Sequence, residues 1–519
     1  MKLVIAEKPS VAMALASVLG ARTRKDGYVE GNGYIVSWCV GHLVGLCDAS
    51  EYDEKYKKWR YEDLPIVPEC WRHKVLEGTK KQFGILKKLM RDSEVNEVIC
   101  ATDAGREGEL IFRLVYEQAG CKKPMKRLWI SSMEEQAIKD GFASLKDGSC
   151  YDSLYQSALC RAKADWLVGI NASRLFSVLY NQNLKVGRVQ TPTLAMIVDR
   201  NQKIREFTKE KYYVAHIKYD DMDAVTEHFQ KKEDANKVAA DCADRMCEVE
   251  KDEVNKKTIY PPKLYDLTTL QREANRMFGY TAQQTLDAVQ EMYEKKLVTY
   301  PRTDSQYLTD EMGESTETLI QMLLGKMPYA EGLEYQPEVN KVLNSKKVSD
   351  HHAIIPTMEV AKADMDSLKE RNRRILYLIS ARVLTATADS YIYESHKCQI
   401  TCNYHTFYLT AKKIKQEGFK AIENKLKQFF GVKSEKEEPE LDIWAGKHYG
   451  PCDSYVSEHF TQPPKQYTED TLLSAMERAG NEELTEDTEK KGLGTPATRA
   501  AIIEKLIQSG FVKREKKNL

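Results

Sequence analysis

Residues 98–109 read VICATDAGREGE, and this stretch determines the fold predicted for the N-terminal part of the chain. The apolar, strand-like run Val98–Ala101 is followed by a turn rich in acidic residues and glycine, and then by a helical pattern over about Glu109–Gln118. A second unit opens the chain, where the apolar run Leu3–Ala6 precedes a helical pattern that ends at Gly20. Strands that alternate with helices predict an α/β domain with a mainly parallel sheet.

Three acidic residues come directly after the predicted strands. Glu7 follows the first strand, and Asp103 and Glu107 follow the strand that ends at Ala101. In open α/β sheets this edge is where ligands bind. Carboxylates that converge there repel each other unless a hard cation such as Mg²⁺ joins them. The alternative is that they are solvated loop acids and charges at helix N-termini, which are common.

A second candidate site is the stretch LVTYPRTDS at residues 297–305. Pro301 pushes the preceding Tyr300 toward an extended conformation, in which residues i and i+2 point the same way. Tyr300 and Arg302 can then face one target, and a phenol beside a phosphate-binding guanidinium suggests attack on a phosphodiester. The chain has 28 tyrosines, so on spacing alone the alternative is a packing or surface role.

The rest of the chain alternates between helical and strand-like regions. Helical spacing covers about residues 151–203, strand-like alternation begins at residue 212 and returns near residues 398–412 and 441–457, and a helical block lies between these β regions. Within that block, Thr268 with Gln271 and Thr281 with Gln284 have the spacing of capping boxes. We therefore expect a β region interrupted by a helical insert that carries Tyr300.

Charge and cysteine usage limit the classes of partner and compartment. Lys plus Arg and Asp plus Glu each number 78, so the formal net charge is zero and any nucleic-acid contact must come from local basic patches. One concentration of basic residues contains Arg161, Lys163, Arg174, Lys185 and Arg188. The alternative is that these residues form an ordinary solvated helix face.

The twelve cysteines include no Cys-x-x-Cys pair, which predicts reduced thiols of a cytoplasmic protein. No run reaches membrane-spanning length, and no phosphate-binding Gly-x-x-x-x-Gly-Lys-Ser/Thr loop is present.

Taken together, these features resemble the type IA DNA topoisomerases, and among them the bacterial topoisomerase III branch. The resemblance runs from Leu3 to the last residues. It rests on IAEKPS (5–10), GHL (41–43), ATDAGREGE (101–109), DWLVG (165–169), GRVQTPTL (187–194), YDLTTLQ (265–271), TYPRTDS (299–305), HHAIIPT (351–357) and GLGTPATR (492–499). Each segment alone is a weak signal, but the ordered set is specific.

The resemblance implies a multidomain fold, α/β plus α and β domains, arranged as a toroid with an N-terminal Toprim domain. Carried over to this sequence, the domains are a Toprim domain (1–148), a helical DNA-binding domain (149–212 and 461–519), a β-rich arch or hinge domain (213–262 and 388–460) and a catalytic tyrosine domain (263–387). Relatives continue past the position of Leu519, so the helical domain is expected to be truncated at its C-terminal end.

The implied function is that of an ATP-independent topoisomerase. It would cleave one DNA strand through a 5′-phosphotyrosine intermediate, pass another strand through the break and religate. Tyr300 would be the nucleophile, and Arg302 and Lys8 would contact the scissile phosphate. Glu7 would protonate the leaving 3′ oxygen, and His351 matches the histidine that the family places near its active site.

The implied cofactor is Mg²⁺, held by Glu7, Asp103 and Glu107, with no nucleotide. Many relatives carry the pattern Asp-x-Asp-x-Glu, whereas the middle position of this chain is Gly105. One carboxylate is therefore missing. Because Mg²⁺ readily keeps several waters, the loss need not abolish binding.

The resemblance also implies a path for the DNA strand, with Trp166 or a nearby tyrosine for base stacking. The implied DNA contacts are Arg161, Asp165, Arg174, Lys185, Arg188, Gln190 and Thr191. The implied partners are single-stranded DNA and negatively supercoiled or catenated DNA, bound by a monomer without a membrane, in the bacterial cytoplasm at the nucleoid.

Two other functions fit parts of the sequence. A Toprim metal-dependent nuclease would use Asp103 and Glu107 but leaves Tyr300 unexplained. A truncated single-strand-DNA-binding remnant would account for Gly105 and for the early end of the chain.

Overall fold

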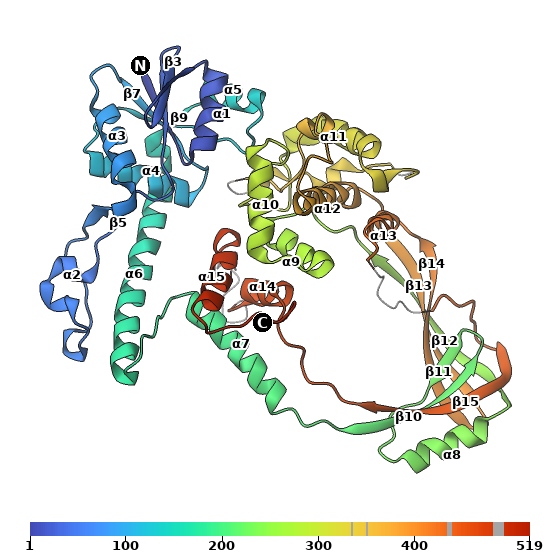
Figure 1. The fold of residues 1–519 in the computed structure, drawn as a ribbon. Helices are drawn as coiled ribbons and strands as arrows, with labels where there is room; N and C mark the ends of the chain where they lie inside the picture. Colours follow the sequence, from blue (N-terminus) through green and yellow to red (C-terminus); the bar gives the residue numbers. More distant parts are fainter. Residues whose placement is uncertain (334–335, 349–350, 433–438, 481–491) are drawn as a thin grey trace.

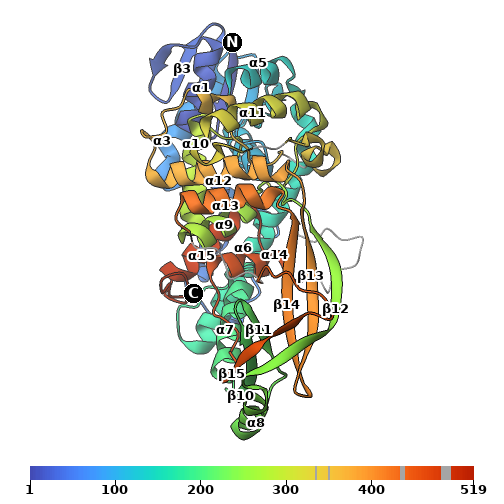
Figure 2. The ribbon, with the colours of Figure 1, turned by 90° about the vertical axis from the view of Figure 1, so that its right-hand side faces the viewer.

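The computed structural model describes residues 1–519 except 334–335, 349–350, 433–438 and 481–491. In Figure 1 the chain leaves an N-terminal α/β part through long helices, enters a β-barrel and returns through a helical part that lies beside the α/β part. The ribbon encircles an open centre, as the expected toroid does. Figure 2 shows that the α/β part and the barrel lie at opposite ends of the molecule.

The N-terminal sheet is parallel at its centre. Its seven strands run in the order β2 (Thr23–Lys25), β3 (Tyr28–Gly31), β4 (Tyr34–Trp38), β1 (Lys2–Ala6), β7 (Glu97–Ala101), β8 (Met125–Arg127) and β9 (Lys146–Asp147). Strand β1 pairs in parallel with β4 and β7, and β7 pairs in parallel with β8. The outer pairs are antiparallel. The predicted parallel sheet is confirmed for the strands that precede the acidic residues.

Helices cover both faces of this sheet, because side chains alternate along each strand. The helices are α1 (Pro9–Leu19), α3 (Lys80–Arg91), α4 (Arg106–Ala119) and α5 (Glu135–Ala143). Val4 of β1 belongs to the core with α1 and α5, whereas Leu3 belongs to the core with α3 and α4. This arrangement leaves the carboxyl ends of β1 and β7 side by side, where Glu7 and Asp103 follow.

Two long helices lead away from the sheet. Helix α6 (Asp152–Tyr180) packs on α4, and α7 (Gln190–Arg205) contacts α15 (Pro496–Gln508). Ile197 of α7 shares a buried core with Leu472 of α14 (Glu469–Arg478) and Ile503 of α15. Helix α15 starts at Pro496 behind the N-cap Thr495. Segments far apart in the sequence therefore form one helical unit.

A closed barrel of six strands occupies the far end of the molecule. In order around the barrel, the strands are β10 (Lys211–Tyr219), β11 (Met222–Val225), β14 (His405–Gln416), β13 (Tyr391–Cys402), β12 (Arg245–Ile259) and β15 (His448–Phe460). Strands β10–β12 precede the helical part that bears Tyr300, and β13–β15 follow it. The barrel is thus the interrupted β region that the sequence predicts.

The helical part that bears Tyr300 lies between the two halves of the barrel. Its helices are α9 (Leu267–Phe278), α10 (Ala282–Glu294), α11 (Gly313–Lys326) and α12 (Glu370–Ala386). The predicted capping box of Thr281 and Gln284 forms at the start of α10. The one predicted at Thr268 is wrong, because Asp266 is the N-cap of α9 and accepts a hydrogen bond from the Thr269 N–H at 2.7 Å.

The remaining elements are short. They are β5 (Val44–Leu46), α2 (Ala49–Tyr52), β6 (His73–Val75), α8 (Lys232–Cys242), α13 (Phe419–Phe429) and 3-10 helices at Glu54–Lys57, Tyr61–Asp63, Glu77–Thr79, Gly148–Tyr151, Asp310–Met312, Pro328–Ala330, Val339–Val342, Ser345–Lys347 and Met358–Ala361. Within the described ranges, none of the helices combines the length and apolar character that crossing a membrane requires.

Candidate active site

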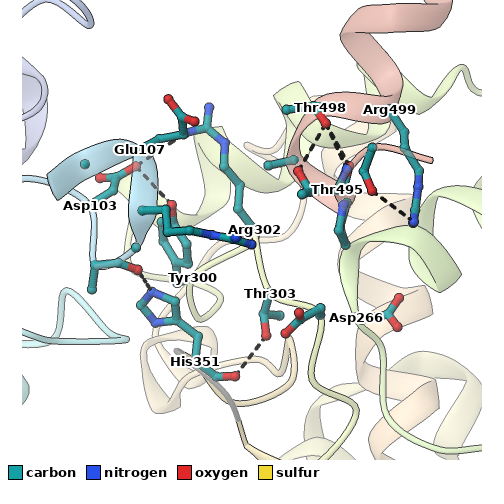
Figure 3. Close-up of a pocket in the computed structure, with 18 of the residues that line it drawn as sticks. Asp103, Glu107, Asp266, Tyr300, Arg302, Thr303, His351, Thr495, Thr498 and Arg499 are labelled. Atoms are coloured by element: carbon teal, nitrogen blue, oxygen red, sulfur yellow. Dashed lines mark hydrogen bonds and ion pairs between the residues drawn. The ribbon is translucent and has the colours of Figure 1, made fainter. Parts of the chain in front are cut away.

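A cavity of about 540 Å³ opens where three parts of the chain meet (Figure 3). The loop after β7 forms one wall, the segment after α10 forms the second, and the start of α15 forms the third. The lining residues are Glu7, 103–108, Arg161, Asp266, Tyr300, 302–304, His351, Glu477 and 494–499. Both sites predicted from the sequence, the acidic one and the one at Tyr300, therefore open into a single cavity.

Tyr300 and Arg302 face the acidic loop together. The Tyr300 hydroxyl donates a hydrogen bond to Asp103 Oδ2 at 3.2 Å. Arg302 Nη1 lies 3.5 Å from the same oxygen and 3.9 Å from Glu7 Oε1. The side chains two positions apart thus reach one target, as their spacing predicts. Tyr300 is only 6% exposed, so this contact is shielded from bulk water.

Burial sets the protonation of this cluster. Burial raises the pKa of Tyr300 well above its ordinary value, and Asp103 raises it further while Arg302 opposes the rise. Burial likewise raises the pKa of Glu7 to about 7; Asp103 adds to this rise, and Arg302 and Lys8 oppose it. Tyr300 is therefore protonated at rest. Glu7 can hold a proton near neutral pH, as a general acid must.

His351 connects the tyrosine segment to the acidic loop. Its Nε2 contacts the Ala104 carbonyl oxygen, and its Nδ1 lies 2.8 Å from Ser131 Oγ. Its own carbonyl accepts a hydrogen bond from the Thr303 hydroxyl at 2.9 Å (Figure 3). Burial lowers the pKa of His351 to about 4, so the ring is neutral at physiological pH. The Tyr300 ring packs against it with centroids 4.3 Å apart.

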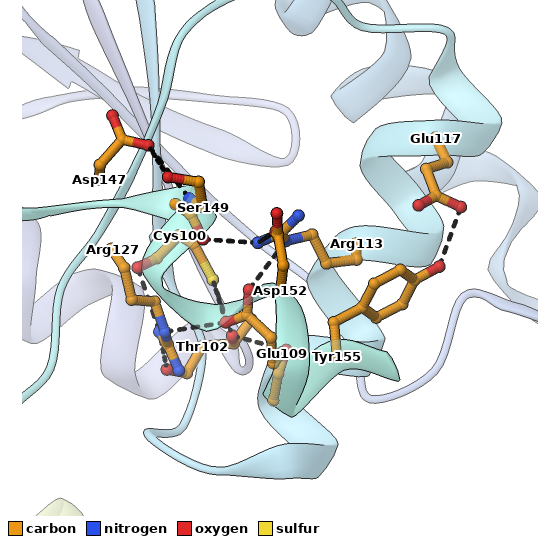
Figure 4. A network of polar contacts seen from close by, with 12 residues as sticks. Cys100, Thr102, Glu109, Arg113, Glu117, Arg127, Asp147, Ser149, Asp152 and Tyr155 are labelled. Atoms are coloured by element: carbon orange, nitrogen blue, oxygen red, sulfur yellow. Dashed lines mark hydrogen bonds and ion pairs between the residues drawn. The ribbon is translucent and has the colours of Figure 1, made fainter. Parts of the chain in front are cut away.

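A buried ion pair holds the acidic loop from behind (Figure 4). Arg127 donates from Nη1 to the Thr102 carbonyl at 2.7 Å and from Nη2 to the Asp103 carbonyl at 2.8 Å. Its Nε lies 3.1 Å from Glu109 Oε2, and Arg113 holds the other Glu109 oxygen at 2.8 Å. Arg127 and Glu109 are each 1% exposed. Removing one partner of such a pair costs about 3–5 kcal/mol, so the loop is held in one position.

The predicted metal ligands are only partly brought together. The Asp103 N–H donates to Glu7 Oε2 at 3.3 Å, whereas Glu107 Oε2 lies 3.4 Å from His42 Nε2, a contact that lowers the pKa of Glu107. Among the described residues, no group of three or more His, Cys, Asp or Glu side chains is placed to hold a metal ion. Two adjacent buried carboxylates still suit Mg²⁺, which often binds one or two carboxylates and keeps its waters.

Gly105, at the end of the acidic loop, and Gly108, in the first turn of α4, differ in the space around them. A Cβ at Gly105 would meet no atom of the described residues within 4 Å, whereas a Cβ at Gly108 would lie 2.0 Å from the Asp103 carbonyl oxygen. The position of Gly105 can therefore accommodate the carboxylate that many relatives carry. Gly108 has to be glycine, because α4 approaches the loop too closely for a side chain.

The predicted DNA-contacting residues are spread along α6, the segment after it and the start of α7. Arg161 lines the cavity, and burial together with the charges of Arg106 and Arg188 lowers its pKa, which indicates that three guanidinium groups lie near one another. Arg188 also pairs with Asp165 at 2.8 and 3.3 Å. Lys185 is exposed, Gln190 is buried at the start of α7, and Thr191 Oγ1 accepts from the Gly187 N–H at 3.1 Å.

Other predicted side chains lie elsewhere. Arg174 is buried, with its guanidinium 5.3 Å from the Trp59 ring centroid, and does not belong to the cavity lining. Lys8 is also outside the lining, and its Nζ lies 3.7 Å from Glu294 Oε1. Trp166 donates its ring N–H to the Cys47 carbonyl at 2.9 Å and packs edge-on against Trp71, so it is a packing residue in this structure.

Sequence reasoning missed the wall formed by α15. Thr495 and Thr498 cap this helix through each other's hydroxyls, and Arg499 donates to the Thr268 hydroxyl at 3.0 Å and to the Leu493 carbonyl at 3.0 Å. Asp266, on the same side, is buried, and burial raises its pKa to about 6. The segment GLGTPATR marked this region in the sequence, but the residues themselves indicated only a helix start.

Comparison with known proteins identifies the family. The family model for DNA topoisomerase matches residues 149–519, and the Toprim domain model matches residues 2–133. DNA topoisomerase 3 of Bacillus subtilis is 39% identical over 99% of this chain and 73% of that protein. DNA topoisomerase 3 of Staphylococcus haemolyticus is 38% identical over 98% of this chain and 73% of that protein. The chain belongs to the type IA DNA topoisomerases, in the topoisomerase III branch.

The fold agrees with this assignment. Full-length topoisomerase I from Thermotoga maritima superposes with a TM-score of 0.74 at 24% identity, covering 99% of this chain and 80% of that one. As a type IA topoisomerase, the chain acts on DNA and needs no nucleotide, and its Toprim domain is a metal-binding fold. These matches do not favour the nuclease or the binding remnant, because the similarity covers the tyrosine-bearing part as well as the Toprim domain.

Proposed function

We propose that Tyr300 is the nucleophile of strand cleavage. Its oxygen would attack the scissile phosphorus while its proton passes by way of Asp103, the acceptor of its hydrogen bond, to solvent in the cavity, so that Asp103 is again ionised after cleavage. The bond from phosphorus to the 3′ oxygen would break, and Glu7 would protonate that oxygen, leaving a 5′-phosphotyrosine and a free 3′-hydroxyl. The supporting observation is the contact of Tyr300, Arg302, Asp103 and Glu7 within one buried cluster. Religation would reverse these steps, with Glu7 as the base.

Arg302 would bind the scissile phosphate and stabilise the charge that develops on it. A guanidinium fits two phosphate oxygens, and preorganised charge is often the largest contribution to catalysis. Lys8, one residue after Glu7, would contact the same phosphate once DNA replaces its contact with Glu294. His351 would keep the tyrosine segment against the acidic loop.

The Toprim acids would hold Mg²⁺. Asp103 and Glu107, with Glu7 beside them, are the oxygen donors that a hard cation prefers. When bound, the cation would align the 3′-hydroxyl for religation more than it drives cleavage. Glu107 would exchange its contact with His42 for this role.

The substrate would be a single DNA strand within negatively supercoiled or catenated DNA. Arg161, Arg188 and exposed Lys185 would contact its phosphates. Further contacts of the strand would come from Asp165, Arg174, Gln190 and Thr191. The enzyme would act as a monomer in the bacterial cytoplasm, at the nucleoid, where such DNA is found.

Strand passage would require the tyrosine domain (263–387) to separate from the Toprim domain (1–148). We propose that the β-rich domain (213–262 and 388–460) is the hinge, because both connections to the tyrosine domain run through the barrel (Figure 1). The helical domain (149–212 and 461–519) would stay with the Toprim domain. Such opening is a hinge motion of packed domains.

Mapping the covalent adduct tests this function. The protein would be mixed with single-stranded DNA labelled at either end, denatured, and digested for mass spectrometry. We expect DNA joined through a 5′ phosphate to the peptide that contains Tyr300. An adduct on a 3′ phosphate, or on another tyrosine, would contradict the proposal.

Arg302→Ala tests the phosphate contact separately. We expect cleavage to slow by about 100-fold or more, since removing one group that stabilises transition-state charge typically costs this much. Single-strand affinity would fall much less, because several other cations contribute to it. An undiminished cleavage rate would exclude Arg302 from the chemistry.

A further inference from the structure

Ser131 contacts the tyrosine segment at two points. It lies four residues beyond the end of β8, within the residues that match the Toprim model. Its carbonyl oxygen accepts a hydrogen bond from the Tyr300 N–H at 3.0 Å, and its hydroxyl lies 2.8 Å from His351 Nδ1. The sequence motifs gave this serine no role, and its neighbour Ser132 differs from it by bonding Glu134 at 3.1 Å.

The contacts of His351 fix the direction of the serine hydrogen bond. His351 Nε2 faces the Ala104 carbonyl oxygen, which can only accept, so Nε2 carries the ring proton. Because the buried ring is neutral, Nδ1 is left with a lone pair. The Ser131 hydroxyl must therefore donate to Nδ1.

We propose that the Ser131 hydroxyl is a positioning group that holds His351 in the tautomer which donates to the Ala104 carbonyl. It thereby keeps Asp103 and Tyr300 in the relative position that cleavage requires. This inference rests on the proposed function of Tyr300. The opposite tautomer would place the Nε2 lone pair against the Ala104 carbonyl, and these two acceptors repel each other. Ser131 acts through His351, and Ala104 is the residue directly after Asp103, the acceptor of the Tyr300 hydroxyl.

Separation of the Toprim and tyrosine domains would break these contacts together. Ser131 and Ala104 belong to the Toprim side, whereas His351 and Tyr300 belong to the tyrosine side. The hydroxyl therefore favours the closed state, in which the nucleophile faces the acidic loop. Without it, a buried ring nitrogen would lose its partner, which is a larger loss than that of one exposed hydrogen bond.

Ser131→Ala removes only the hydroxyl and keeps the backbone contact with Tyr300. We expect the rate of adduct formation on single-stranded DNA to fall about tenfold, the effect of losing one partly buried hydrogen bond to a buried ring. Single-strand affinity should stay within about twofold of wild type, because no phosphate contact changes. Ser131→Thr, which keeps a hydroxyl, should restore most of the rate, and Ser132→Ala should match wild type.

A double-mutant cycle separates positioning from a general structural effect. In His351→Gln, the amide nitrogen can still donate to the Ala104 carbonyl, but the ring nitrogen that accepts from Ser131 is gone. We expect Ser131→Ala to have no further effect on the cleavage rate in that background. The inference would be overturned by an equal loss of cleavage rate in both backgrounds, or by equal cleavage rates for Ser131→Ala and Ser132→Ala. In either case, adduct formation by the wild-type protein would still support the function of Tyr300. A wild-type protein without a Tyr300 adduct would overturn both.

Discussion

The acidic loop with the first turn of α4 (residues 102–108) and the stretch proposed to bind DNA (residues 161–191) are both rich in charge, but their charged groups are held very differently. In the loop, Arg127 donates to the carbonyls of Thr102 and Asp103, and the Asp103 carboxylate accepts from Tyr300. In the stretch, Lys185 is exposed and Arg188 has one exposed partner, Asp165. Buried partners fix the loop, whereas solvent surrounds much of the stretch.

This difference matches the two tasks that we propose for these regions. Transfer of a phosphoryl group to Tyr300 requires reacting atoms held within a fraction of an ångström, and buried hydrogen bonds achieve this. Attraction of a DNA strand requires only positive charge near its phosphates, and flexible side chains can supply it. We therefore expect small changes in the loop to affect rate strongly and changes in the stretch to affect affinity weakly.

Gly108→Ala should have the largest effect. The new Cβ would lie 2.0 Å from the Asp103 carbonyl oxygen, so either the loop or α4 must move. A displacement of about 1 Å at a catalytic group can cost about 100-fold in rate, and we expect at least that loss of adduct formation. Gly105→Ala is the matched control, since its Cβ meets open space among the described residues. Equal losses in the two variants would contradict a fixed loop.

Removal of divalent cations should have the next largest effect. With EDTA present, we expect adduct to form but religation to slow on the order of tenfold to a hundredfold, because the 3′-hydroxyl loses its alignment. The measurement is the decay of preformed adduct after high salt is added, with and without Mg²⁺. Religation that is equally fast without metal would exclude Asp103 and Glu107 as a functional metal site.

Gly105→Asp should have a smaller effect in the opposite direction, because it should strengthen metal binding at the acidic loop. The open space at this position accommodates a carboxylate, and added ligand charge strengthens binding of a hard cation. We expect half-maximal religation at an Mg²⁺ concentration lower by about three- to tenfold. Gly105→Asn, similar in size but uncharged, should shift this concentration much less. A higher Mg²⁺ requirement in Gly105→Asp would indicate that the loop has no room for the carboxylate.

Lys185→Ala should have the smallest effect. Loss of one phosphate contact should lower the slope of log affinity against log salt by about 0.7 and leave the rate of cleavage of bound DNA unchanged. Fluorescence anisotropy with a labelled single strand at several salt concentrations measures the slope. Lys237→Ala on α8 of the barrel, also exposed, is the control. If the slope of log affinity against log salt is identical in the two variants, Lys185 does not contact the DNA strand.

Local signals in the sequence were sufficient for β1 and β7 and for the acidic residues that follow them. Asp103 lies directly beyond β7, as the apolar run ending at Ala101 predicts. The helix after it starts at Arg106, three residues before the predicted Glu109, so Glu107 lies in the first helical turn and reaches His42. The capping box expected at Thr268 fails for a similar reason, since a nearer N-cap, Asp266, competes for the helix start.

Contacts between distant segments could not be predicted in this way. The hydrogen bond between Ser131 and His351 joins residues 220 positions apart, and no periodicity in the sequence relates them. Trp166 shows the same limit, because its ring N–H binds Cys47 from another part of the chain. Motif order identified Tyr300, Arg302 and the acidic residues of the cavity, but tertiary packing determined which residues meet there.

Tyr300→Phe tests the central claim most directly, with adduct yield and single-strand affinity measured on the same preparation. Tyr293→Phe is the matched control, because Tyr293 is also buried and its ring packs 5.5 Å from that of Tyr300. We expect no adduct from Tyr300→Phe at unchanged affinity, and normal adduct from Tyr293→Phe. Adduct that persists in Tyr300→Phe, or strand hydrolysis in its place, would contradict the account.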